Sequence, residues 1–154
     1  MPALCILLLS LLVRQGSGKV IRIGSPEEYA ELAASTSVSF GEYLETTVLL
    51  EADIDFGDEV CPPLGSSSSP FNGVFDGQGH TIKNLKISTT DSYIGLIGYS
   101  QGAIIRNVIV DNDLSVTSNE ITSGSIYIGG ILGYLEPVNE SQNRKLRKFG
   151  FDYP

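Results

Sequence analysis

The sequence predicts an all-β protein, a short β-solenoid with a single α-helix that covers its N-terminal end. The string TIKNLKI (81–87) returns as IIRNVIV (104–110). The offset from position 81 to position 104 has the size typical of one solenoid coil, in which each turn stacks its apolar side chains on those of the next. A second pair of strings, YIGLIGY (93–99) and IGGILGY (128–134), has a larger offset. The two offsets therefore predict coils of unequal length.

Residues 1–18 have the pattern of a secretory signal peptide. An apolar run from Ala3 to Leu9 resumes as far as Val13, which is too short to span a bilayer. Gly16 and Gly18 supply the small residues that favour cleavage after position 18. An uncleaved amphiphile or a misassigned start codon is the alternative. We therefore expect a secreted or cell-surface protein whose mature chain has no stable membrane span.

Length, charge and cysteine content limit what the mature chain, from position 19 to position 154, can form. It is long enough for one domain with a narrow core. The net charge of −8 for the whole chain disfavours a general affinity for nucleic acid. Cys61 would be the only cysteine of the mature chain, so we expect a buried apolar thiol and no internal disulfide, with an intermolecular one left open. We expect no cofactor.

Residues 19–43 are expected to form a strand followed by the capping helix. Lys19–Ile23 alternates as a short strand. Ser25 then suits the N-cap position, with Pro26 at the first helical position and Glu28 returning a hydrogen bond to the Ser25 amide. Three residues share the apolar face of the helix: Tyr29, Leu32 and Ala33. We expect this helix to cover one end of the stack and so protect its strand edges.

Residues 44–135 are expected to form the β-helix itself. Thr46–Phe56 has the composition of one strand, with Ile54 and Phe56 pointing one way and the aspartates between them the other. Gly57–Pro70, rich in proline and serine, is expected to be a loop. From Phe71 onward, frequent glycines predict short strands separated by tight corners.

Asn84 and Asn107 explain how such corners are made. Ile82 and Leu85 would face opposite sides of a regular strand, yet both are apolar. The backbone must therefore interrupt the alternation of faces between them, so that both side chains point inward. Asn tolerates the left-handed conformation that does this. At a spacing of one coil, the two amides are expected to stack as a hydrogen-bonded ladder. Six glycines are expected at bends or close approaches of strands: Gly77, Gly79, Gly95, Gly98, Gly130 and Gly133.

The strings FNGVFDGQGHTIKNLKI (71–87), GAIIRNVIV (102–110) and IGGILG (128–133) together resemble the GLUG-type repeats of secreted and surface proteins. The resemblance covers residues 44–134 and implies a right-handed parallel β-helix of the pectin-lyase-like class. Proteins with such repeats include adhesin-like stalks and IgA-cleaving metallopeptidases. No HExxH zinc motif is present, so the resemblance does not imply peptidase activity.

Residues 136–154 depart from the repeat pattern. Another apolar string is due near residues 140–146, where SQNRKLRK offers a single apolar residue. The segment is expected to cap the stack, to be disordered, or to mark a truncated product of a longer repeat protein. Its basic cluster, Arg144 to Lys148, is expected to be solvated. Asn139 lies in a glycosylation sequon.

Two groups of residues are candidates for a site. Asp53, Asp55 and Asp58 form the densest acid group and are a weak calcium candidate, because DIDFGDE lacks the pattern of a known calcium loop. Asp76 and His80, four residues apart, are candidates for acid–base catalysis, with a structural role for His80 as the alternative. Lys83 and Arg106 are expected to stack outward on one face.

Two classes of function follow. The first is a non-enzymatic extracellular scaffold of the adhesin type, with an extracellular protein or a glycan as partner, because folding accounts for the informative residues. The second is the remnant of a carbohydrate-active lyase or hydrolase, favoured only by analogy of fold.

Overall fold

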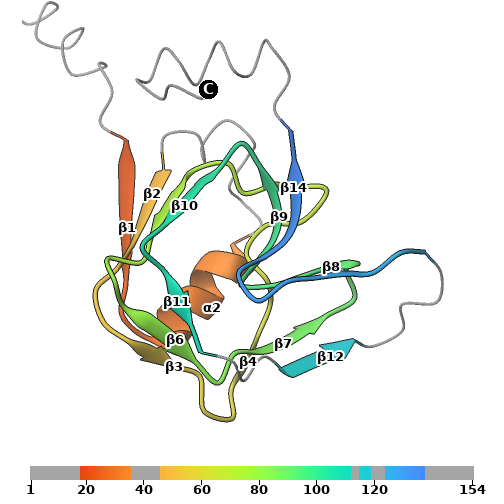
Figure 1. Cartoon of the computed structure of the whole chain (residues 1–154). Coiled ribbons are helices and arrows are strands. Elements are labelled where there is room, and N and C mark those ends of the chain that lie inside the picture. Colours follow the sequence, from red (N-terminus) through yellow and green to blue (C-terminus); the bar gives the residue numbers. More distant parts are fainter. Residues whose placement is uncertain (1–17, 36–45, 112–114, 119–123, 138–154) are drawn as a thin grey trace, which may run out of the picture.

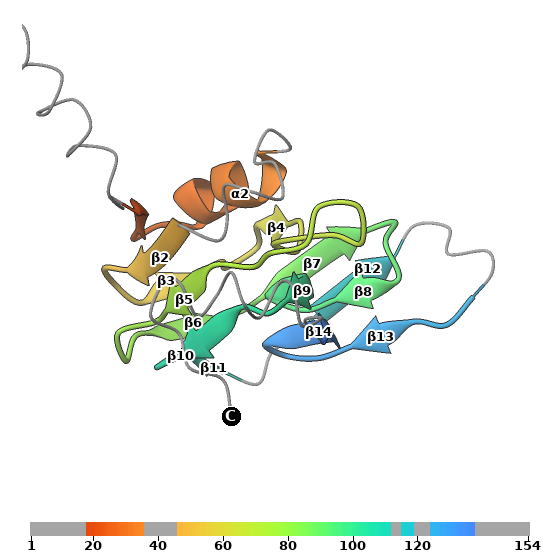
Figure 2. The ribbon, with the colours of Figure 1, turned by 90° about the horizontal axis from the view of Figure 1, so that it is seen from above.

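The structure, a computed structural model, describes residues 18–35, 46–111, 115–118 and 124–137. Within them the chain forms a parallel β-solenoid of about three turns with a single short helix, as predicted. Figure 1 looks along the stack, so that successive turns lie over one another, and Figure 2 shows the same turns as layers. All but the last residue of the predicted signal peptide, and all but the first two residues of the predicted tail, lie outside the described residues.

Every strand pairs in parallel with the strand one turn earlier or later. The largest sheet has the order β1 (Lys19–Ile23), β2 (Thr46–Leu50), β5 (Val74–Asp76), β10 (Ile104–Arg106). Two three-stranded sheets follow around the coil: β3 (Ile54–Asp55), β6 (Thr81–Lys83), β11 (Ile109–Val110), and β4 (Val60–Cys61), β7 (Lys86–Thr89), β12 (Ser115–Ser118). Two pairs complete it: β8 (Tyr93–Ile94) with β13 (Tyr127–Ile128), and β9 (Ile97–Gln101) with β14 (Leu132–Glu136).

The core is a set of apolar columns that run along the stack. Val48 lies opposite Phe75, which lies opposite Ile105 in the next turn. Ile54 and Ile82 begin a second column in the same way. Paired residues of a parallel ladder point to the same side, so each column is continuous. Its residues in the turns before the last one are completely buried.

The helix α2 (Pro26–Ala34) covers one end of the stack, as expected (Figures 1 and 2). Tyr29 and Leu32 are buried beneath it, and Tyr29 packs edge-on against Phe56 with ring centroids 5.5 Å apart. The Ser25 hydroxyl accepts from the Glu28 amide, which confirms the predicted N-cap. The Glu28 carboxylate, however, accepts from the amide of Gly24 and not of Ser25.

Two expected elements are divided differently. The predicted strand Thr46–Phe56 breaks after Leu50, because the chain turns a corner there and begins a new side of the coil at Ile54. The predicted loop Gly57–Pro70 contains β4, in which Cys61 contributes to the core. Ile54 and Phe56 are both buried, as expected.

The predicted period, in which position 81 returns at position 104, is wrong, and so is the asparagine ladder built on it. Ile82 pairs with Val110, and Ile105 pairs with Phe75, so one turn is several residues longer than that offset. Asn84 follows a strand of one sheet, whereas Asn107 follows a strand of the neighbouring sheet. The two strings resemble each other because they build two different corners with the same conformation. Lys83 and Arg106 accordingly lie on different sheets rather than on one stacked face.

The other details of the corners agree with the sequence. Asn84 and Asn107 have φ angles of 52° and 54°, in the left-handed region. The second repeat is confirmed, because Tyr99 lies opposite Tyr134. Gly79 has a φ of +84°, and four of the other predicted glycines would bring an added Cβ within 3 Å of backbone, namely Gly77, Gly95, Gly98 and Gly133. Gly130 lies at a bend in open space.

Candidate functional site

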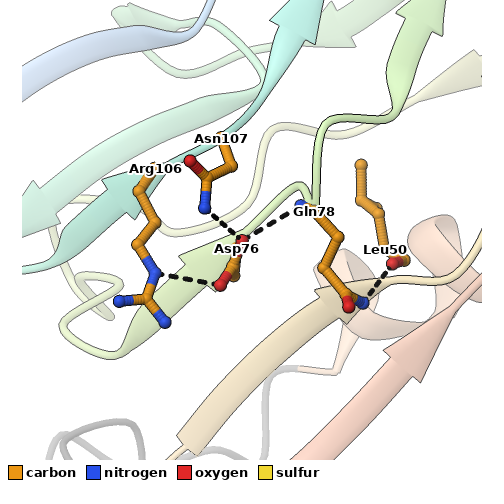
Figure 3. A network of polar contacts seen from close by, with 5 residues as sticks. All are labelled: Leu50, Asp76, Gln78, Arg106 and Asn107. Carbon is orange, nitrogen blue, oxygen red and sulfur yellow. Dashed lines mark hydrogen bonds and ion pairs between the residues drawn. The ribbon is translucent and has the colours of Figure 1, made fainter.

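The carboxylate of Asp76 accepts three hydrogen bonds. Its Oδ1 accepts from the amide of Gln78 at 3.0 Å and from Nδ2 of Asn107 at 3.1 Å, and its Oδ2 accepts from Nε of Arg106 at 2.9 Å. Figure 3 shows that these donors surround the carboxylate from the same turn and from the next. The side chain of Gln78 extends the network to the carbonyl of Leu50 in the preceding turn. Asp76 is buried and its pKa is lowered, first by the Gln78 amide and then by Asn107.

Other acidic side chains join turns in the same way. Asp55 accepts from Nδ2 of Asn84, and Asp58 accepts from Nζ of Lys86, each donor lying one turn later. Glu51 pairs with Arg22 at 3.0 Å, again across one turn. The pKa of Asp55 is lowered by the Asn84 amide, and that of Asp58 by the Lys86 ammonium. These carboxylates therefore hold successive turns together.

His80 and Asp76 do not contact one another as an acid–base pair would, because each is held by other partners. His80 Nδ1 lies 3.4 Å from Oδ1 of Asp53, which also accepts from the amide of Thr81. Asp76 is instead bonded to Arg106 and Asn107. Proton transfer requires the acid and the base to reach one substrate, and these two side chains are held by different partners. A shallow hollow does lie beside Asp76, lined also by Gln78, Gly79, Asn107, Val108 and Ile109.

The calcium candidate also fails to assemble. Asp53, Asp55 and Asp58 each turn to a different donor of the next turn. Calcium needs six to eight oxygen ligands converging on one point. Within the described part of the chain, no three His, Cys, Asp or Glu residues gather in a way that would hold a metal ion.

The largest aromatic cluster of the described residues lies at the corner between β8 and β9 and consists of four tyrosines, which we call the tyrosine corner: Tyr93, Tyr99, Tyr127 and Tyr134. Tyr93 stacks on Tyr127 of the next turn at 5.4 Å, with the ring planes 15° apart. Tyr99 meets Tyr93 edge-on at 4.8 Å, and it lies 5.1 Å from Tyr134 with the two ring planes tilted by 33°. The rings come from β8 and β9 of one turn and from β13 and β14 of the next. They meet at the corner where β8 and β9 lie at an angle to each other (Figure 1).

Polar groups border the tyrosine corner. The Tyr99 hydroxyl donates to Oε2 of Glu136 at 3.0 Å, and Nε2 of Gln101 donates to the same oxygen at 2.8 Å. Burial among the rings, together with the Glu136 carboxylate, raises the pKa of Tyr99 to about 12. Tyr127 is the outermost ring, with 41% of its surface exposed. The corner therefore presents neutral aromatic surface beside one carboxylate and one amide.

Sequence reasoning did not identify this cluster as a site. The strings YIGLIGY and YIGGILGY contain all four tyrosines, and the match of Tyr99 with Tyr134 belongs to the second repeat of the sequence. The missing information was geometric, because Tyr93 and Tyr99 meet only through the bend between their strands. A repeated tyrosine at both ends of a glycine-containing string was the available signal.

Comparison with protein-family models, with curated proteins and with solved structures found no match to this chain. Among the residues that the structure describes, no helix has the length and apolar character needed to cross a membrane.

Proposed function

We propose that the chain is a non-enzymatic, extracellular or cell-surface β-helix module of the GLUG type, which acts as an adhesin-type scaffold. The observation that carries this proposal is the difference between the contacts of its acidic side chains and those of its aromatic side chains. The acids that catalysis would need are engaged between turns, whereas the tyrosine corner leaves the Tyr127 ring exposed at the surface. The apolar run at residues 3–13 and the FDGQGHTIKNL string support secretion and family.

The tyrosine corner is the face through which this scaffold would contact its partner. Tyrosine combines a large rigid apolar body with a hydroxyl, and it is enriched where proteins recognise ligands. A glycan suits the corner, because a sugar ring has an apolar C–H face for the aromatic rings and hydroxyls for Glu136 and Gln101. An extracellular protein is the other class of partner.

The test is binding to immobilised glycans by the full chain and by Tyr127→Ala. We expect the variant to bind at least about tenfold more weakly, equivalent to about 1.4 kcal/mol. The matched control is Val60→Ala, which removes a similarly exposed side chain from β4, in a different sheet and an earlier turn. Equal binding by wild type and Tyr127→Ala would remove the corner from the proposal.

The second candidate is a carbohydrate-active enzyme remnant, favoured by the hollow beside Asp76. It predicts new reducing ends or unsaturated products when the chain is incubated with pectic or other acidic polysaccharides. Activity that His80→Ala or Asp76→Ala abolishes, in a variant that remains folded, would overturn the scaffold proposal.

A further inference from the structure

The last turn of the solenoid is built like an interior layer. Its inward positions lie directly opposite core residues of the turn before it: Ile105 opposite Phe75, Val110 opposite Ile82, Val116 opposite Ile87, Ile128 opposite Ile94, and Leu132 opposite Ile97. All five overlying residues are at most 1% exposed. The five inward residues of the last turn named above are all apolar, although no further layer of described residues lies beneath them.

The exposure of these residues shows how much apolar surface is left uncovered. Ile128 is 60% exposed, and Leu135, which pairs with the buried Ser100, is 55% exposed. The remaining inward residues of the turn are only partly buried. Apolar surface gathered in one contiguous patch marks a contact site, in contrast to single exposed side chains.

The two ends of the stack differ in this respect. At the first end, α2 covers the core and buries Tyr29 and Leu32 (Figure 2). At the second end, the outer edges of β10, β11, β12, β13 and β14 have no partner strand among the described residues. Open edges of parallel strands invite pairing and are normally covered. Whatever covers this end must supply apolar side chains.

The segment that follows the last turn has such side chains. Lys148-Phe149-Gly150-Phe151-Asp152-Tyr153 alternates aromatic and non-aromatic residues, which places three rings on one side of an extended chain. Eleven residues separate Pro137 from Phe149, and at about 3.3 Å per residue they reach roughly 36 Å, more than enough to cross a turn whose sides are a few residues long.

Charge also favours this segment. The part of the chain from position 138 to position 154 contains Arg144, Lys145, Arg147 and Lys148 against Glu140 and Asp152, a net charge of +2. Because the whole chain has a net charge of −8, everything before position 138 has −10. A second copy of the chain would bring like charge to the same end, whereas the basic segment brings opposite charge.

We propose that residues 148–153 dock across the open end of the last turn, with Phe149, Phe151 and Tyr153 over the inward residues Ile105, Val116, Ile128 and Leu132. The segment acts there as a second cap, opposite α2. This inference does not depend on the proposed partner or on the tyrosine corner.

The test is a nitroxide label at the end of the full chain, in a Cys5→Ser, Pro154→Cys variant. Burial raises the pKa of the Cys61 thiol to about 12, so that the new cysteine is labelled selectively. We expect the methyl signals of Ile105, Ile128 and Leu132 to lose intensity, while those of Ile23, Leu32 and Leu50 at the capped end are retained. Uniform loss, or no loss, overturns the proposal.

Two further samples identify the occupant. A mixture of isotope-labelled chains without nitroxide and nitroxide-labelled chains without isotope reports only contacts between copies, and signal loss there overturns the proposal in favour of a dimer. A Phe149→Ser/Phe151→Ser/Tyr153→Ser variant should restore the signals and raise the fluorescence of an apolar dye. The matched control, Gly150→Ser/Asp152→Ser, changes the opposite side of the segment and should behave as wild type, and a failure to do so also contradicts the docking.

Discussion

Asn107 and Asp76 are joined across one turn by an amide-to-carboxylate hydrogen bond of 3.1 Å. The left-handed conformation of Asn107, with φ of 54°, turns the corner between two strands and directs the amide toward the turn before it. Asn84 makes the equivalent bond to Asp55 at the next corner. One residue type thus shapes the corner and fixes its position over the previous turn.

We expect Asp76→Ala to destabilise the fold by about 2 to 3 kcal/mol, because a buried carboxylate bonded to charged and amide donors contributes about this much and its partners lose their acceptor. The measurement is the free energy of unfolding in urea. Asp58→Ala is the control, because Asp58 is fully exposed and its ion pair should contribute little. Equal losses in the two variants would contradict the special position of Asp76.

Acid should weaken the fold. The pKa values of Asp53, Asp55, Asp58 and Asp76 are lowered in the folded chain below the value of about 3.9 expected when it is unfolded. Their contribution is therefore complete above that value and is lost as the pH falls through the folded pKa values. Urea midpoints should stay level from about pH 7 to 5 and fall below about pH 4. A midpoint that rises on acidification would refute this account.

Gly133 and Gly130 provide a test of close packing between turns. A Cβ at Gly133 would lie 2.7 Å from the carbonyl oxygen of Gly98 and from the amide nitrogen of Ile94, whereas one at Gly130 would meet nothing within 4 Å. We expect Gly133→Ala to cost about 1 to 3 kcal/mol and Gly130→Ala to be nearly neutral. Thermal unfolding of both variants decides, and a larger cost at Gly130 would show that the packing is assigned to the wrong glycine.

Cys61 should be unreactive until the chain unfolds. It is 2% exposed, and burial raises the pKa of its thiol to about 12. In a Cys5→Ser chain, alkylation at pH 8 should be slow and should accelerate in urea in parallel with unfolding. Rapid alkylation of the folded chain would show that the thiol is accessible.

Much of the fold follows from local patterns that the sequence displays. The N-cap at Ser25, the inward pair Ile54 and Phe56, and the left-handed asparagines each depend on a few neighbouring residues, and each is confirmed. The period was predicted incorrectly because similarity of sequence reports similarity of conformation, and two corners of one coil share a conformation. The true length of one turn is given by the sequence separation between Glu51, Asp55 and Asp76 and their partners in the neighbouring turn.

The candidate site was less accessible to such reasoning. Asp76 and His80 are close in sequence, but the backbone turns a corner between them at Gln78, which has a φ of 50°. The two side chains therefore point in different directions, and His80 approaches Asp53. The tyrosine corner requires the angle between two strands as well as the register between two turns. Neither quantity is encoded in the spacing of tyrosines along the chain.

The unequal lengths of the turns have a consequence for protein engineering. Ser115 pairs with Lys86, whereas Tyr127 pairs with Tyr93, and the second pair is further apart along the chain than the first. Additional residues therefore enter between β12 and β13 without disturbing either pairing. The registers of these two strand pairs thus do not depend on the number of residues between β12 and β13. Foreign peptides grafted between positions 118 and 127 should leave both pairings intact, so that the scaffold retains its melting temperature.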